Sequence, residues 1–279
     1  MKYRPIMSVF KSYFLSGLLC MGLLQANDVV SQSSTSKDNV SWSNYPVGNI
    51  IFKSLSPETE GARIYHELVS NPEDYIASQA RKVLETLYFS PSDSIPGIKT
   101  IHYTLKEYDG ISAKGGNPPT IYIDYSTKWV EKTFGKELNK EKVDYETRGV
   151  LYHELTHGFQ LEPQGIGSYG TNKTFFAMIE GVADAVRLLN GCFTEKDRPK
   201  GGSYMDGYRT TGFFLAWLTK TKDPDFLKKF NQSTLKVIPW SFDGAIKYAL
   251  GNQFQVDGLW NQYLTEMGDI AVANNQNPR

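Results

Sequence analysis

The chain has 279 residues, and its 30 basic and 30 acidic side chains give a formal net charge of zero. This balance offers no electrostatic reason to expect binding to nucleic acid or to an anionic membrane surface. Hydrophobic residues make up 40% of the sequence, and a chain of this length can bury one sizeable core.

The first 26 residues are typical of a cleavable export signal. Three basic residues, Lys2, Arg4 and Lys11, accompany an apolar run over 14–24 that falls short of the about 20 residues a membrane helix needs. We expect cleavage after Ala26, and therefore a secreted or periplasmic protein without stable membrane insertion; an uncleaved anchor is the alternative. Cleavage would leave 27 basic and 30 acidic residues, a net charge of −3.

The same cleavage would remove Cys20 and leave Cys192 as the single cysteine. One cysteine cannot form an intrachain disulfide, so the core has to supply the stability. Gly191 is suited to a left-handed helix cap just before Cys192. We therefore expect a cysteine that packs at a helix end and is neither catalytic nor disulfide-bonded.

The rest of the chain divides into a flexible linker over 27–45, one domain over 46–273 and a flexible tail over 274–279, the two ends being rich in polar residues. Early in the domain, β-like runs at 49–53, 98–105 and 120–124 occur with a helical pattern at 72–89. Later, helical patterns dominate, at 143–160, 173–190, 208–220, 223–231 and 255–267. This segregation predicts an α+β fold with a sheet-containing amino-terminal half and a mainly helical carboxyl-terminal half.

The segment His153-Glu154-Leu155-Thr156-His157 lies at the junction of these halves. Residues four apart share one face of an α-helix, so His153 and His157 could bind the same metal ion. Glu154 is placed to accept a proton from an attacking water molecule. The alternative is a buried helix whose histidines only satisfy hydrogen bonds, although two of the four histidines in the chain are here. A cleft is expected at such a junction.

A catalytic zinc ion usually has a third protein ligand. A third histidine six residues after His157 is ruled out, because Pro163 occupies that position. Glu162 is a rival ligand, but at five positions past His157 it points away from the metal-binding face. Glu180 fits better, since an acidic residue inside an apolar helical run is unusual unless it is paired or binds a metal.

Asp184 lies one turn after Glu180 and could accept the remaining N–H of a ligand histidine. Small Gly181 and Ala183 would let this helix pack closely against the motif helix. The alternative for both acidic residues is a solvated face on a surface helix.

Two segments, 152–160 and 179–188, together resemble the hallmark motifs of the plant basic secretory proteins and their bacterial relatives. Weaker similarity adds a strand pair, 110–116 with 120–124, and a helix at 207–218, so the resemblance covers roughly 45–270. It implies a zincin-like metallopeptidase with one zinc ion, the ligands His153, His157 and Glu180, Glu154 as general base, and Asp184 behind a ligand. The expected net charge of −3 departs from the family's name, so no role tied to basic charge transfers.

We therefore predict an exported zinc metallopeptidase that acts on a peptide or protein substrate. Tyr208, which begins a helix after two glycines, is the first choice for stabilising the oxyanion, although it could simply pack there. Tyr169, in a glycine-containing loop, is the second choice. The strand around Ile121–Ile123 could offer an open edge to an extended peptide.

Two other functions stay open at this point. One is a binding domain that keeps the zincin fold without turnover, against which the intact Glu154 argues. The other is a zinc hydrolase of a non-peptide amide or ester, which would use the same chemistry. The sequence does not predict an oligomeric state.

Overall fold

The computed structural model describes residues 42–271. The expected signal peptide over 1–26, most of the linker over 27–45 and the tail over 274–279 lie outside these residues. The last linker residues are described: Trp42–Asn44 forms a 3-10 helix, and the Arg81 side chain donates to the Tyr45 carbonyl over 3.3 Å. Tyr45, which was placed in the predicted linker, therefore already contacts helical residue Arg81 of the domain.

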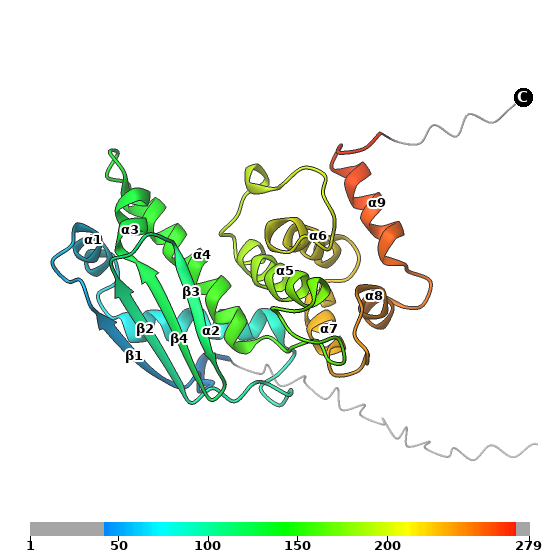
Figure 1. The fold of residues 1–279 in the computed structure, drawn as a ribbon, viewed down its shortest axis with the longest axis horizontal. Helices are drawn as coiled ribbons and strands as arrows, with labels where there is room; N and C mark the ends of the chain where they lie inside the picture. The colour runs from blue at the N-terminus through cyan, green and yellow to red at the C-terminus, as the bar shows by residue number, and fades with distance from the viewer. Residues whose placement is uncertain (1–41, 272–279) are drawn as a thin grey trace, which may run out of the picture. The chain divides into compact units, whose positions relative to one another are not determined.

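The amino-terminal half contains a four-stranded mixed sheet with the order β1-β2-β4-β3 (Figure 1). Its strands are β1 (Asn49–Ser54), β2 (Thr100–Lys106), β3 (Ser112–Asn117) and β4 (Thr120–Ser126). Strands β1, β2 and β4 are parallel, and β3 pairs antiparallel with β4. The expectation of an open edge at Ile121–Ile123 is wrong, because β4 is paired on both sides and the free edge belongs to β3.

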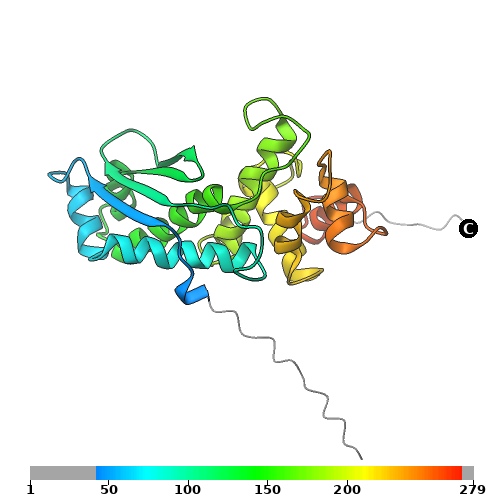
Figure 2. The same cartoon turned by 90° about the horizontal axis from the view of Figure 1, so that it is seen from below.

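Four helices of this half are α1 (Glu60–Leu68), α2 (Pro72–Leu87), α3 (Thr127–Phe134) and α4 (Lys140–Phe159). Figure 2 shows α2 and α4 packed on one face of the sheet. Alternate strand residues such as Tyr103 and Ile123 are fully buried there, as the period of two along a strand requires. His102 and Tyr122 stack on the opposite face with ring centroids 4.9 Å apart. The sequence pattern did not predict α1 and α3.

The carboxyl-terminal half is helical in its regular elements, which are α5 (Lys173–Leu189), α6 (Tyr208–Thr221), α7 (Phe226–Ser233), α8 (Phe242–Leu250) and α9 (Val256–Glu266), with a short 3-10 helix at Glu195–Asp197. All but α8 overlap with predicted helical patterns. The α+β class, with its mixed sheet in the first half, is confirmed. Within the described residues, no helix is long and apolar enough to cross a membrane.

Helix α5 lies against α4 on one side and α6 on another (Figure 1). A Cβ added to Gly181 would lie 2.3 Å from the Thr211 side chain of α6, and one added to Gly212 would lie 2.8 Å from the Cβ of Asp184. The expectation that Gly181 lets α5 approach the motif helix is therefore wrong. Glu180 faces α4, and each helical residue is rotated by about 100° from the one before, so Gly181 faces α6 instead.

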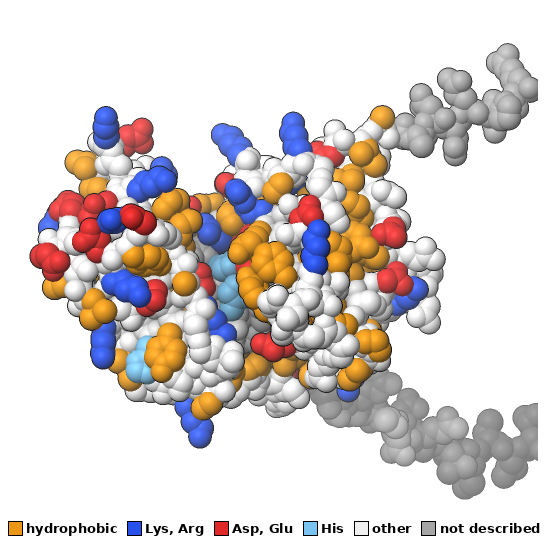
Figure 3. Space-filling view, viewed as in Figure 1, with side chains coloured by type: hydrophobic (Ala, Val, Ile, Leu, Met, Phe, Trp, Pro, Cys, Tyr) orange, Lys and Arg blue, Asp and Glu red, His pale blue; other side chains and the backbone are white. Residues whose placement is uncertain are grey.

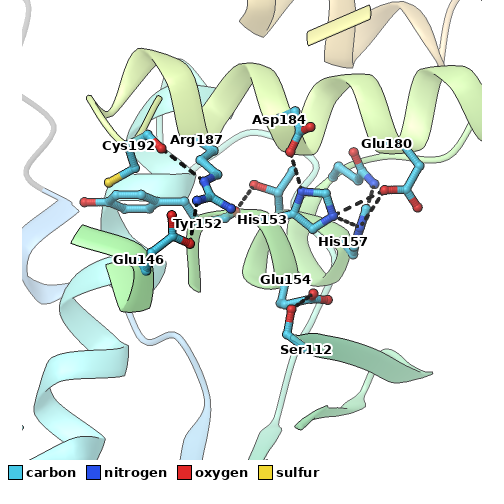
Figure 4. Close-up of polar contacts among 12 residues, drawn as sticks. Ser112, Glu146, Tyr152, His153, Glu154, His157, Glu180, Asp184, Arg187 and Cys192 are labelled. Atoms are coloured by element: carbon cyan, nitrogen blue, oxygen red, sulfur yellow. Dashed lines mark hydrogen bonds and ion pairs between the residues drawn. The ribbon is translucent and has the colours of Figure 1, made fainter. Parts of the chain in front are cut away.

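Arg187 of α5 connects this helix to α4 through hydrogen bonds (Figure 4). Its guanidinium donates to Glu146 over 3.0 Å and to the Cys192 carbonyl over 3.1 Å. Gly149 of α4 lies beneath this group, and a Cβ there would approach the Arg187 Nε to 2.6 Å. Gly149 of α4 thus leaves room for the Arg187 side chain where α4 and α5 meet.

The end of α5 has the expected cap. Gly191 has a φ of +77°, and the Cys192 N–H donates to the Arg187 carbonyl over 3.0 Å, which is the hydrogen-bond pattern of a Schellman motif. Cys192 is a buried free thiol without a disulfide partner among residues 42–271, and Cys20 lies outside them. Burial raises the pKa of the Cys192 thiol, as expected for a packed rather than a reactive cysteine.

An asparagine from α7 holds the end of α4. Asn231 is fully buried, and its Oδ1 accepts the Leu161 N–H over 2.9 Å, just beyond α4. Its Nδ2 donates to the Leu87 carbonyl at the end of α2 over 3.4 Å. One side chain therefore connects three helices that are far apart in the sequence.

Candidate metal centre

Helix α4 carries the histidine motif without a break in its helical structure. The Asn139 side chain caps its first turn by accepting the Lys142 N–H over 2.9 Å, as asparagine commonly does at a helix start. Four residues of helix bring His153 and His157 to one face, where their Nε2 atoms lie 3.0 Å apart. The spacing predicted from the sequence is thus present.

Glu180 extends from α5 to the same point (Figure 4). Its Oε2 lies 3.2 Å from the His153 Nε2 and 3.5 Å from the His157 Nε2. These contacts lack hydrogen-bond geometry, so this buried oxygen has no hydrogen-bond partner. Two ligands of a tetrahedral zinc ion at 2.0–2.1 Å would lie about 3.3–3.4 Å apart. The three residues could therefore hold one metal ion, whereas Glu162 is exposed and outside the group.

A polar side chain contacts the Nδ1 atom of each imidazole. The Asp184 Oδ1 accepts from the His153 Nδ1 over 2.7 Å, so Nε2 is the ring nitrogen that faces Glu180 and would bind a metal ion once its own proton is lost. The Gln160 Nε2 lies 3.0 Å from the His157 Nδ1, while the buried Gln160 Oε1 has no partner. A half-turn of this amide would let Oε1 accept the Nδ1 proton and leave the His157 Nε2 free. Sequence reasoning missed Gln160, whose one hint is its place a turn after His157.

The charge of the group also suits a cation. Burial opposes a protonated His153, but the carboxylates of Asp184 and Glu180 outweigh burial and raise its pKa to about 10. Burial likewise opposes ionised Glu180, yet the two imidazoles hold the pKa of that carboxyl well below its usual range. Glu154, Glu180 and Asp184 are all buried, and buried carboxylates need a positive partner. Two imidazoles and a carboxylate form a donor set that zinc accepts.

Glu154 points from α4 toward the edge of the sheet (Figure 4). The Ser112 hydroxyl at the start of β3 donates to the Glu154 Oε1 over 2.5 Å. Sequence reasoning missed Ser112, because it lies in a run of small residues and no sequence signal distinguishes the residue that contacts the motif helix. This contact brings the edge strand beside the metal group.

Two tyrosines complete the surroundings of the group. Tyr208 begins α6 with a φ of +43°, a conformation that costs a non-glycine residue energy and often marks a functional site. Its ring stacks on His153 with centroids 6.1 Å apart, and the residue is 48% exposed. The Tyr169 hydroxyl donates to the Glu180 Oε1 over 2.6 Å, so it holds the carboxylate of this residue in place.

These residues line a cavity of about 530 Å³. Its walls come from β3, the end of α4, the loop that follows, α5 and the first residue of α6. Figure 3 shows it as a groove between the sheet and the helical half, with a pale blue histidine at its base. The cleft expected at the junction of the two halves is therefore present.

The fold and the site define an α+β protein with a His-His-Glu group that could hold a metal ion in a groove. The model of a family described as peptidase of plants and bacteria matches residues 48–263. This match spans more than half of the chain, which therefore belongs to that family, and the resemblance to the basic secretory proteins is confirmed. Searches of curated proteins and of solved structures find no match.

Proposed function

We propose that the chain is an exported zinc metallopeptidase that hydrolyses peptide bonds in the groove. The observation that carries the proposal is the convergence of the Glu180 Oε2 with two imidazole Nε2 atoms at 3.2 and 3.5 Å, one residue away from the buried carboxylate of Glu154. Membership of a peptidase family supports a peptide or protein substrate. The secreted or periplasmic location is proposed from the sequence pattern of residues 1–26, which is typical of an export signal.

His153, His157 and Glu180 would hold one zinc ion per chain. When bound, zinc supplies a Lewis acid that lowers the pKa of a water molecule toward about 7 and polarises a carbonyl group. Asp184 accepts the Nδ1 proton of His153, Gln160 would do the same for His157 with its amide turned, and Tyr169 fixes the carboxylate of Glu180. Such supporting contacts orient ligands and affect both affinity and activity.

Glu154 is the general base in this mechanism. Ser112 occupies its Oε1, so Oε2 is the atom left to accept the proton of the attacking water. The same carboxyl group then returns the proton to the nitrogen of the leaving amine. Because Ser112 lies on β3, it also fixes the position of the base relative to the strand edge.

Tyr208 is the residue that we assign to stabilising the developing oxyanion. Its ring stacks on His153 and its backbone is held in the left-handed region, which orients the side chain over the groove. Tyr169 is the weaker candidate, since its hydroxyl already donates to Glu180. The free edge of β3 would pair with an extended peptide through main-chain hydrogen bonds.

The test combines metal analysis with hydrolysis of an unbiased peptide pool. The protein purified without chelator should carry about one zinc ion per chain, and its addition to the pool should generate new peptide termini. The Glu154→Gln variant should keep its zinc while its hydrolysis falls by about 10²–10⁴-fold. A zinc-loaded wild-type protein that cleaves nothing would leave the binding-domain alternative, and full turnover in the zinc-loaded variant would exclude Glu154 as base.

A further inference from the structure

Strand β3 directs one charged side chain into the groove. Ser112 and Lys114 are alternate residues of the strand, so they share one face of the sheet. Their partners on β4 are Tyr125 and Ile123, both fully buried on the helix-covered side. Lys114 accordingly lines the groove that also contains Glu154 and the metal group.

Lys114 has no ion pair or hydrogen bond to any residue within 42–271, and it is the one lysine or arginine that lines the groove there. Lys106 of the same sheet differs, because its ammonium lies 2.7 Å from Asp124. Burial lowers the pKa of Lys114, while the charges of Glu162 and Glu154 oppose this change. Partial burial of an unpaired ammonium group is costly, and an anionic ligand would offset that cost.

Glu162 is the other charged group that faces this part of the groove. It lies in the segment after α4, is exposed, and forms no ion pair with Lys114. Its negative charge opposes binding of an anion on its own side, so an acidic group is favoured only where Lys114 reaches. One side of the groove, at Lys114, therefore attracts an anionic group, and the other side, at Glu162, repels it.

We propose that Lys114 binds a carboxylate group of the substrate and makes the groove selective for acidic peptides. The proposal rests on the proposed peptidase function. A peptide extended along β3 would place the residue beside Lys114 about 7 Å from the residue beside Ser112, which is two positions along the chain. Since Ser112 contacts the catalytic Glu154, the carboxylate lies within about three residues of the cleaved bond. It belongs either to an Asp or Glu side chain or to the carboxyl terminus of the peptide.

The experiment uses matched fluorogenic peptides with the zinc-loaded protein. One series places Glu or Gln at each of the three positions on either side of the cleaved bond. A second series ends in a free acid or an amide at the same distances. We expect the wild type to favour the carboxylate about tenfold in kcat/KM in one series, through a lower KM, since charge-assisted contacts are among the stronger hydrogen bonds.

Four variants test whether Lys114 causes this preference. Lys114→Met should remove the preference and leave cleavage of the neutral peptides within about twofold, and Lys114→Glu should reverse it, so that each neutral peptide is cleaved faster than its carboxylate counterpart. Glu162→Gln should enlarge the preference. Lys106→Met is the matched control, because Lys106 belongs to the same sheet, pairs with Asp124 and does not line the groove; it should change nothing.

A preference in the first series identifies a side chain as the source of the carboxylate, and a preference in the second identifies the terminus; each supports the proposal. It is overturned if the wild type shows no preference, or if the preference survives in Lys114→Met. If the wild type cleaves no peptide, the proposed function fails separately. Binding of the same peptides to zinc-loaded Glu154→Gln protein then tests the role of Lys114. The proposal requires that the carboxylate form binds about tenfold more tightly than the neutral form.

Discussion

Helices α4 and α5 both contribute to the metal group, but they reach it by different means. On α4, helix geometry alone brings two histidines four residues apart to an Nε2 separation of 3.0 Å. Glu180 lies 23 residues after His157 and reaches the same point only because α5 packs between α4 and α6. One part of the site is therefore local in the sequence, and the other depends on tertiary packing.

The largest effects should come from removing ligands on either helix. His153→Ala and His157→Ala should abolish zinc binding, because each removes one of the two imidazole donors that zinc prefers over a carboxylate. Glu180→Ala should weaken it strongly, whereas the control Glu162→Ala should bind zinc like the wild type. Elemental analysis after dialysis against a weak chelator measures all four. If Glu162→Ala loses zinc and Glu180→Ala retains it, the third metal ligand is Glu162 and the assignment to Glu180 is wrong.

Zinc affinity should rise with pH. The pKa of His153 is raised to about 10 in the folded, metal-free protein, against about 6.5 in an unfolded chain, so a metal ion has to displace a proton over that interval. Affinity should therefore increase by about tenfold per pH unit near neutrality, while the metal-free protein loses stability as the pH rises from about 6.5 toward 10. Competition with a chromophoric chelator and urea unfolding at several pH values measure the two trends. A flat affinity profile would contradict the protonated state of His153.

Supporting contacts should matter less than ligands. Asp184→Asn and Gln160→Leu each remove one group that holds an imidazole proton, and we expect zinc affinity to fall by about 10–100-fold in each. Gln160→Glu provides the sharper comparison, since its carboxylate can still accept the Nδ1 proton of His157 and should preserve affinity. Equal losses in Gln160→Leu and Gln160→Glu would mean that the amide acts by packing rather than by accepting a proton.

The smallest effect should come from the packing that carries α5 to the site. A Cβ on Gly212 would lie 2.8 Å from the Asp184 Cβ and 2.9 Å from the Ala185 backbone nitrogen, so Gly212→Ala should cost about 1–3 kcal/mol of unfolding free energy. Gly258 of α9 is the control, because a Cβ there meets nothing within 4 Å, and Gly258→Ala should leave stability unchanged or raise it by about 1 kcal/mol. Thermal unfolding separates the two. Weaker zinc binding in Gly212→Ala would show that the packing also positions Asp184.

The difference between local and tertiary determinants also explains what the sequence could predict. Helical spacing indicated the two histidines, and an acidic residue in an apolar helix indicated Glu180. The sequence of a strand does not reveal which strands it pairs with. The sequence therefore did not show that β4 is central in the sheet and that β3 provides the edge. Ser112, Lys114 and Gln160 were missed for the same reason, since only tertiary contacts distinguish them from other polar residues. Helices α1, α3 and α8 are 9, 8 and 9 residues long, so each offers few turns in which a periodic pattern can show, although α7, with 8 residues, overlapped with a predicted pattern.

The contact of Asn231 with the end of α4 has a consequence for synthesis of the chain. Leu161 leaves the ribosome 70 residues before the amide that accepts its N–H, and Leu87 precedes its own partner by 144 residues. A nascent chain that stops short of α7 therefore lacks the side chain that joins the ends of α2 and α4. The histidines can therefore be synthesised and helical before the end of α4 gains this contact, so the motif helix is anchored at its carboxyl end only after α7 has been made.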